Sequence, residues 1–399
     1  MKLATALLAA SALAGAAAVA QPKGSAQPIA NYWMDVSTTS GFGAGMGARP
    51  SMDQVMAMMR GGPGSVGHAL DLRLASKIKP AGTGQADHFI PSGMTMGASL
   101  PLVTPLQAPP APRADGLPSN FQQPKGRMLV YWGCGERVGA GQPMVIDFAK
   151  LAAGQVPAEM KAMASMAKIV SGPMTAPGFG KWPNDKDSRP VPPNSSLAGA
   201  HRIAGNYSPE IAFTLGAGQD FMAGLGLTDA GSTPAGAAQL RWQAVPDATG
   251  FALAMFGSNP SGDVIMWSSA NKAGMTALDY VAPAEVKRLV TAGAVLPPSA
   301  TQCLLPAEVA AASPMGMVTM IGYGPEVGFA DSPKSPKWSV KVRYKTTASL
   351  MRGMQGMMGG ASMDAAQPVQ QAQPQLVKKK RRSLLGDIIQ GATGIPVDR

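Results

Sequence analysis

The stretch Lys337-Trp338-Ser339-Val340-Lys341-Val342-Arg343-Tyr344 alternates between polar and apolar side chains. Successive side chains of an extended strand point to opposite faces, so this pattern is typical of a strand with one buried face. We expect the apolar residues, from Trp338 to Tyr344, to face a core. We expect the basic residues, Lys341 and Arg343 among them, to face solvent. The stretch therefore predicts a half-buried antiparallel β-strand.

Similar short segments, rich in β-branched and aromatic residues, recur along the chain and predict further strands. They are Tyr32–Thr39, Ala69–Ala75, Arg127–Trp132, Met144–Phe148, Glu210–Leu215, Gln239–Ala244, Gly250–Phe256, Asp263–Ser268, Met317–Tyr323 and Trp338–Thr346. The 399 residues include 48 glycines and 36 prolines, which favour turns and linkers over long helices. Only 14% of the residues are charged, against roughly 25% in an average soluble domain. The composition therefore excludes a heavily charged surface. The predicted strands, together with the frequent glycines and prolines, predict a mainly β fold.

Helices are few and begin with a common signal. Pro157, Pro283 and Pro306 are each followed by Ala-Glu. Proline suits the first position of a helix, and an acidic residue in the first turn complements the helix dipole. We expect short helices that cover or join strands.

The residues Met1–Ala20 read as a secretory signal. Lys2 precedes the apolar run Leu3–Leu13, and Ala18-Val19-Ala20 forms a small-x-small cleavage site. No later stretch of about 18 apolar residues occurs, so no membrane-spanning helix is expected. We therefore predict an exported protein, periplasmic or associated with the cell envelope.

Composition divides the rest of the chain into two antiparallel β modules, at 28–150 and 198–350, of which the second is sandwich-like. The first contains a proline-rich loop at 101–125, and a helix with a linker occupies 151–197. The remaining segment, 351–399, is rich first in Met and Gly and then in Gln and Pro, which predicts a disordered tail.

The second module carries a resemblance to a known family. The segment Leu240-Arg241-Trp242-Gln243-Ala244-Val245-Pro246-Asp247-Ala248-Thr249-Gly250-Phe251-Ala252-Leu253 resembles the B–C hairpin of fibronectin type III domains. In that family a strand with a Trp is followed by a Pro-bearing turn and an aromatic residue on the next strand. The predicted strand through Trp338–Tyr344 would then resemble the closing strand. The resemblance implies a β-sandwich with a binding or spacing role more than a catalytic one.

The two cysteines, Cys134 and Cys303, are expected to form a disulfide if the protein is exported. Such a bond would close a loop of about 170 residues, which the chain-entropy model values at about 5 kcal/mol. The alternative is two separate buried thiols, each packed as a small hydrophobe.

Signals for catalysis or for a cofactor are weak. The segment Gly133–Gly139 does not match the G-x-G-x-x-G spacing, because Val138 stands where the third glycine would be. The segment also leads into another strand instead of a helix. It is therefore interpreted as a glycine-rich hairpin. A nucleophilic reading would combine Cys134 with His68, His88 or His201, and it would make the protein a secreted hydrolase. No local motif supports it, so we expect no catalytic residue, no cofactor and no zinc site.

Methionine supplies 27 residues and gathers in clusters. One consists of Met52, Met56, Met58 and Met59, and the other of Met351, Met354, Met357, Met358 and Met363. Thioether sulfur is a soft ligand that suits Cu(I), so Met351, Met354, Met357 and Met358 form an alternative metal site. Equally, methionine is an adaptable packing residue that binds no metal.

The tail ends in a basic run before a short apolar face. The basic residues are Lys378, Lys379, Lys380, Arg381 and Arg382. The apolar residues Leu384, Leu385, Ile388 and Ile389 fall on one side of a helix. Such a segment can contact anionic envelope lipid or an acidic polymer, or it can remain a solvated tail. No aromatic residues interleave with the charges, and nucleic acid is not an expected partner.

The sequence as a whole predicts an exported, non-enzymatic cell-envelope protein with a binding or structural role. Its partners would be an anionic envelope lipid or polymer at the tail, or another envelope protein. A Met-rich copper-binding protein is the first alternative and a secreted hydrolase is the second.

Overall fold

The alternating segment lies in the strand β16 (Trp338–Arg352), which pairs along its length with the antiparallel strand β15 (Gly316–Ala330). The computed structural model describes residues 27–41, 66–105, 126–152, 172–173, 176–273 and 279–353. Val340, Val342 and Tyr344 are buried as expected. Arg343 is not on a solvated face as predicted, because it is only 5% exposed. Other polar and aromatic side chains cover it, and they form the site described below.

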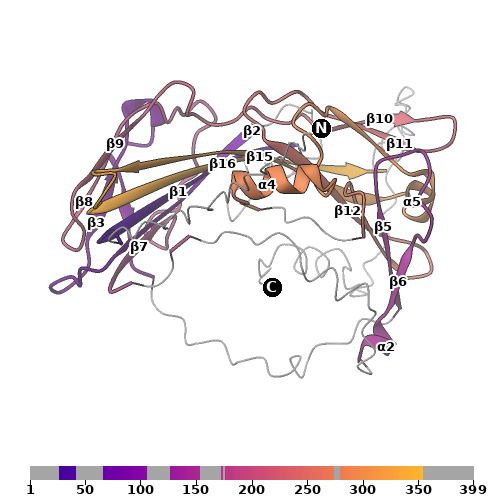
Figure 1. Cartoon of the computed structure of the whole chain (residues 1–399), viewed down its shortest axis with the longest axis horizontal. Helices are drawn as coiled ribbons and strands as arrows, with labels where there is room; N and C mark the ends of the chain where they lie inside the picture. The colour runs from indigo at the N-terminus through magenta and orange to yellow at the C-terminus, as the bar shows by residue number, and fades with distance from the viewer. Residues whose placement is uncertain are drawn as a thin grey trace, which may run out of the picture. The chain divides into compact units, whose positions relative to one another are not determined.

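β16 stands near the middle of a nine-stranded sheet (Figure 1). In spatial order its strands are β6 (Met144–Asp147), β5 (Arg127–Trp132), β13 (Val264–Ser268), β12 (Gly250–Ser258), β15, β16, β1 (Ala30–Gly41), β2 (Val66–Ser76) and β7 (Gly178–Trp182). β1 runs parallel to β16, and β13 runs parallel to β5. The other neighbours are antiparallel.

This sheet corrects the domain plan in two respects. It joins strands from 28–150 with strands from 198–350, so the two ranges do not form separate sheets. It also takes β7 from within 151–197, the range predicted to be a helix and linker. The parallel pairs make the sheet mixed, whereas the sequence predicted antiparallel pairing alone. The coarser prediction of a mainly β fold is confirmed.

Two smaller sheets share a core with one face of the large sheet. One contains β4 (Ser99–Leu102), β3 (Ala86–Phe89), β8 (Gly199–Gly205) and β9 (Ile211–Leu215). The other contains β10 (Thr228–Ser232), β11 (Ala238–Arg241) and β14 (Gln302–Leu305). A single buried apolar cluster includes Tyr32 of β1, Phe213 of β9, Leu240 of β11 and Trp267 of β13. The arrangement is therefore sandwich-like, with the core between the sheets.

Short helices complete the described part of the chain: α2 (Phe148–Ala152), α4 (Pro283–Thr291), α5 (Ala307–Ala312) and the 3₁₀ turn η1 (Ser92–Met94). α4 has the proline and the acidic first turn that the sequence predicted. Its Val286 and Leu289 belong to a buried cluster with Ile321 and Tyr323 of β15, and this cluster is separate from the main core. Figure 1 shows α4 against the nine-stranded sheet. The helix thereby covers part of the second face of the nine-stranded sheet. We call this second face the outer face.

The segment that resembles a fibronectin type III hairpin does not form a paired hairpin. β11 and β12 belong to different sheets, although the rings of Trp242 and Phe251 are in contact, with centroids 5.7 Å apart. The predicted signal Met1–Ala20, the helix after Pro157 and the segment 354–399 lie outside the described residues. Among the described helices, none has the length and apolar composition needed to cross a membrane.

Candidate functional site

The outer face carries a row of charged side chains where β2, β1 and β16 lie side by side. Along β1 the residues Tyr32, Met34 and Val36 point into the core, so Asp35 and Ser37 point the other way. The strand register places Asp35 between Asp71 of β2 and Arg343 of β16. Ser37 lies one step further along, between Ala69 and Lys345.

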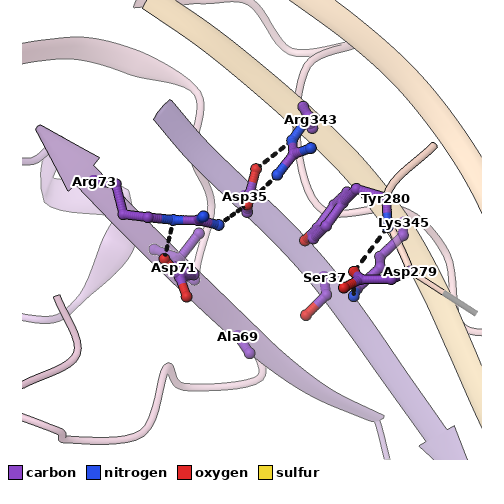
Figure 2. A pocket seen from close by; sticks show the side chains of 10 residues that line it. Asp35, Ser37, Ala69, Asp71, Arg73, Asp279, Tyr280, Arg343 and Lys345 are labelled. Atoms are coloured by element: carbon purple, nitrogen blue, oxygen red, sulfur yellow. Dashed lines mark hydrogen bonds and ion pairs between the residues drawn. The ribbon is translucent and has the colours of Figure 1, made fainter. Parts of the chain in front are cut away.

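Asp35 is the centre of this charged row. It is 1% exposed, and its carboxylate accepts hydrogen bonds from both Arg343 and Arg73. Arg343 Nε donates to Asp35 Oδ1 at 2.6 Å, and Arg73 Nε donates to Asp71 Oδ1 at 2.8 Å. Figure 2 shows the two arginines on either side of the Asp35 carboxylate. A carboxylate in this position needs such partners, because burial of an unpaired charge is costly.

Aromatic rings enclose the Arg343 guanidinium. Its central carbon lies 4.6 Å from the centre of the Trp33 ring and 4.5 Å from the centre of the Tyr280 ring. Lys345 lies 4.1 Å from the Tyr280 ring and donates to Asp279 Oδ1 at 2.7 Å. These cation–π contacts and the ion pair hold Asp279 and Tyr280, which precede α4, above β16.

A pocket of about 260 Å³ opens among these groups. Its lining consists of Asp35, Ser37, Ala69, Leu70, Asp71, Arg73, Asp279, Tyr280, Arg343 and Lys345. Three acidic and three basic side chains are present, so their formal charges balance. Ser37 and Ala69 are small, which leaves space between Asp71 on one side and Lys345 on the other.

The environment changes the pKa of several groups in the pocket. Partial desolvation raises the pKa of Asp71, Arg73 lowers it in part, and Asp35 raises it further. Partial desolvation would also raise the pKa of Asp279, but the hydrogen bond and charge of Lys345 lower it overall. Burial raises the pKa of Tyr280, and the Asp35 charge adds to the rise. Tyr280 therefore keeps its proton at neutral pH, and Figure 2 shows its hydroxyl directed toward β1. The pocket thus offers fixed donors and acceptors, and no histidine or cysteine lines it.

The predicted disulfide between Cys134 and Cys303 is confirmed, with a Cα–Cα distance of 5.3 Å. It connects the turn after β5 with β14, and so links the nine-stranded sheet to the three-stranded one. The turn lies in an antiparallel β5–β6 hairpin, as the interpretation of Gly133–Gly139 required. Because its sulfur is bonded to Cys303, Cys134 is not available as the nucleophile of a hydrolase.

Two of the three histidines are in contact with each other, whereas the ring of His68 stacks on that of Phe221. His88 Nε2 and His201 Nδ1 are 2.9 Å apart, and the Tyr32 hydroxyl lies 2.9 Å from His88 Nδ1. His201 Nε2 lies 2.8 Å from the carbonyl oxygen of Leu197. Burial lowers the pKa of both histidines, so both are neutral at pH 7. Because a carbonyl only accepts, every proton in this line points from Tyr32 toward Leu197. The line is buried in the core and ties β1 to β3 and β8.

The remaining predicted residues are only partly visible. Met351 lies in β16, directly opposite Met317 of β15. Met354, Met357, Met358 and the tail segment 378–389 lie outside the described residues. Within the described ranges, no group of three or more His, Cys, Asp or Glu side chains is placed to hold a metal ion.

Sequence reasoning missed the charged row. Asp35, Arg73 and Arg343 each lie on strands that were predicted, but nothing in the sequence aligns those strands with one another. Their only local signal is a charged residue at alternate positions, and that pattern also fits solvated side chains.

Comparison of the chain with protein-family models, with curated proteins and with solved structures gives no match. The similarity of residues 240–253 to fibronectin type III domains therefore remains a resemblance.

Proposed function

We propose that this chain is an exported, non-enzymatic envelope protein that binds a small zwitterionic solute in the outer-face pocket. This proposal rests on the pocket lining, which has an acidic group, Asp71, on one side and a basic group, Lys345, on the other. A free amino acid or a short peptide has the matching pair of charges.

The proposed ligand follows from how the charges are held. Lys345 can donate to the ligand carboxylate together with the Tyr280 hydroxyl, and Asp71 can accept from its ammonium group. Each charged group already has an internal partner, Asp279 for Lys345 and Arg73 for Asp71. These internal pairs compensate the charges of both groups. Because the lining has balanced charge, it favours a ligand of zero net charge over a simple anion or cation.

Two observations support the envelope location. The N-terminal segment has the pattern of a secretory signal, and the Cys134–Cys303 disulfide suits an oxidising compartment. We also propose that the tail contacts anionic envelope lipid or an acidic polymer through the basic run 378–382 and the apolar residues after it. Another envelope protein is the other candidate partner.

The pocket is tested by calorimetric titration of the purified chain with L-alanine and L-alanyl-L-alanine. N-acetylated and C-amidated forms of the dipeptide are the matched ligands. Loss of one charge-assisted hydrogen bond costs roughly 1.5–3 kcal/mol, so each capped form should bind at least about tenfold more weakly.

A variant of the pocket lining tests whether the zwitterion binds in the outer-face pocket. Ala69 is exposed and lies opposite Ser37, so Ala69→Phe should fill the space between the charged walls and abolish binding. Ala69→Ser, which adds little volume, is the control and should bind as the parent does. Unchanged melting temperatures would show that both variants fold. Failure of every zwitterion to bind, or equal binding by Ala69→Phe, would contradict the proposal.

The tail has its own test. Leu384→Asp combined with Ile388→Asp keeps the basic run but removes the apolar face. This double variant should no longer co-sediment with phosphatidylglycerol vesicles, whereas the parent chain should co-sediment with these and not with phosphatidylcholine alone. Equal sedimentation of the parent and the variant would rule out the apolar contact.

A further inference from the structure

Methionines lie together at the open end of the β15–β16 hairpin, where β15 begins and β16 ends. This end of β16 is remote from the pocket. Met317 and Met351 are direct cross-strand partners. Met317 lies on the same side of β15 as Ile321, which packs under α4 on the outer face. Directly opposite residues of an antiparallel pair have Cβ atoms roughly 4.5–5.5 Å apart, so two flexible thioether side chains can bring their sulfurs together.

A third methionine lies beside this pair. Met315 precedes β15, and its Cγ would be 3.0 Å from a Cβ built at Gly353, two residues beyond Met351. Gly353 has a φ of +87° and no side chain, which leaves room for Met315 at the end of the hairpin.

These methionines differ from those of the core. Met34, Met255 and Met320 are at most 1% exposed, whereas Met315 is 49% exposed. Met317 and Met351 are half-buried. A packing role explains the buried methionines, but it does not explain a long apolar side chain held in solvent beside two others. Each of these three side chains is therefore at least partly exposed to solvent.

The chemistry of the cluster selects a soft ion. Thioether sulfur favours Cu(I) over divalent ions such as Zn²⁺, which prefer nitrogen, thiolate or oxygen ligands. The neighbouring cation Arg352 is offset by Asp229, whose carboxylate lies 3.3 Å from Arg352 Nε. A monovalent ion can therefore approach without facing an uncompensated positive charge.

We propose that Met315, Met317 and Met351 form a Cu(I) site with three thioether ligands. This site is separate from the zwitterion pocket, and it places the ligands across a strand pair rather than along one helix. Copper enters and leaves as Cu(I), so binding requires no change of oxidation state.

The proposal is tested by anaerobic titration of the full chain with Cu(I) in competition with bicinchoninate. The variants are Met317→Leu with Met351→Leu, and Met315→Leu alone. Leucine conserves volume, so the fold should persist. The double variant should bind one equivalent of Cu(I) fewer than the parent. Met315→Leu should weaken that equivalent by at least the roughly 10-fold to 100-fold that loss of a second-shell partner costs.

Two controls keep the result specific. Met266 lies two strands from Met317 on the same face of the sheet. The variant Met266→Leu should therefore leave Cu(I) binding unchanged. The triple variant Met354→Leu, Met357→Leu, Met358→Leu removes the methionines that follow in the sequence and should retain the proposed equivalent. The proposal is overturned if the parent binds no Cu(I), if the Met317/Met351 double variant binds as the parent does, or if only the triple variant loses the ion. None of these outcomes depends on whether the pocket binds a zwitterion.

Discussion

The two faces of β1 bury polar groups in opposite ways. On the core face, Tyr32 begins a line of neutral groups that runs through His88 and His201 to a backbone carbonyl. On the outer face, Asp35 is surrounded by two guanidinium groups next to a pocket. A neutral donor and a neutral acceptor satisfy each other with one hydrogen bond, so such a pair can be buried without water. The buried Asp35 carboxylate instead has two charged partners, and the three side chains together line a polar pocket.

The largest effect should come from Asp35→Asn. The change leaves Arg343 and Arg73 without their shared negative charge, and Arg343 is itself buried. Breaking a buried pair from one side costs about 3–5 kcal/mol. Urea unfolding should show a loss of this size. A loss below about 1 kcal/mol would mean that the cluster is hydrated like a surface ion pair.

The core face should respond to pH instead. Burial lowers the pKa of His88 and His201 in the folded protein. At a pH between the lowered pKa and the ordinary pKa near 6.5, the unfolded chain therefore binds more protons than the folded protein does. Their stabilising contribution is complete above about pH 6.5 and is lost as the pH falls. The unfolding free energy should therefore fall as the pH drops below 6.5, with a slope no steeper than about 2.7 kcal/mol per pH unit, the limit for two groups that bind protons only in the unfolded chain. Double replacement by phenylalanine should flatten this slope, and a parent protein with constant stability over that range would contradict the neutral line.

Tyr32→Phe should have a smaller effect on the same face. It removes the hydroxyl that donates to His88 Nδ1 and leaves that buried acceptor unsatisfied. Such a loss costs roughly 1–3 kcal/mol. Thermal and urea unfolding measure it, and Met34→Leu on the same strand is a volume-conserving control. Equal stability of Tyr32→Phe and the parent would show that the line contributes nothing.

The smallest effect on stability should come from Asp71→Asn. Asp71 belongs to the charged row, but its side chain is 56% exposed. Exposed ion pairs contribute about 0–1 kcal/mol, so the unfolding free energy should barely change. Binding of a zwitterion should nevertheless weaken, because the ammonium loses its partner. A large loss of stability would place Asp71 with Asp35 as a structural charge.

Many strands could be predicted from the sequence, because each carries its own pattern. The predicted bounds of the two longest strands, β15 and β16, nevertheless end seven and six residues too early. β5 was predicted at its observed bounds, and β1, β2 and β12 within two residues at each end except the start of β2. The strands β4, β8, β10 and β14 were missed, and so were the short strands β3 and β7. Their sequences, Ala-Asp-His-Phe and Gly-Phe-Gly-Lys-Trp, are too brief and too mixed to show alternation. Pairing with neighbours, rather than intrinsic propensity, makes them strands.

The site was harder to predict than the strands. Alternation correctly divided the residues of β16 between two faces, but it could not show that Asp35, Trp33 and Tyr280 would cover Arg343. That depends on the pairing of β1 with β16, which brings together residues 308 apart in sequence. The disulfide could be predicted because only two cysteines are present and a compartment was inferred for them.

The pairing of β1 with β16 also orders events in time. During synthesis from the N-terminus, β1 must wait for about three hundred residues before its central neighbour exists, a delay that goes with slow folding in proteins dominated by distant contacts. Until then the central strands β15 and β16 are absent, so the apolar face of β1 cannot pack into a complete core. The central pairing of the sheet can therefore form only after nearly all of the described chain has been synthesised.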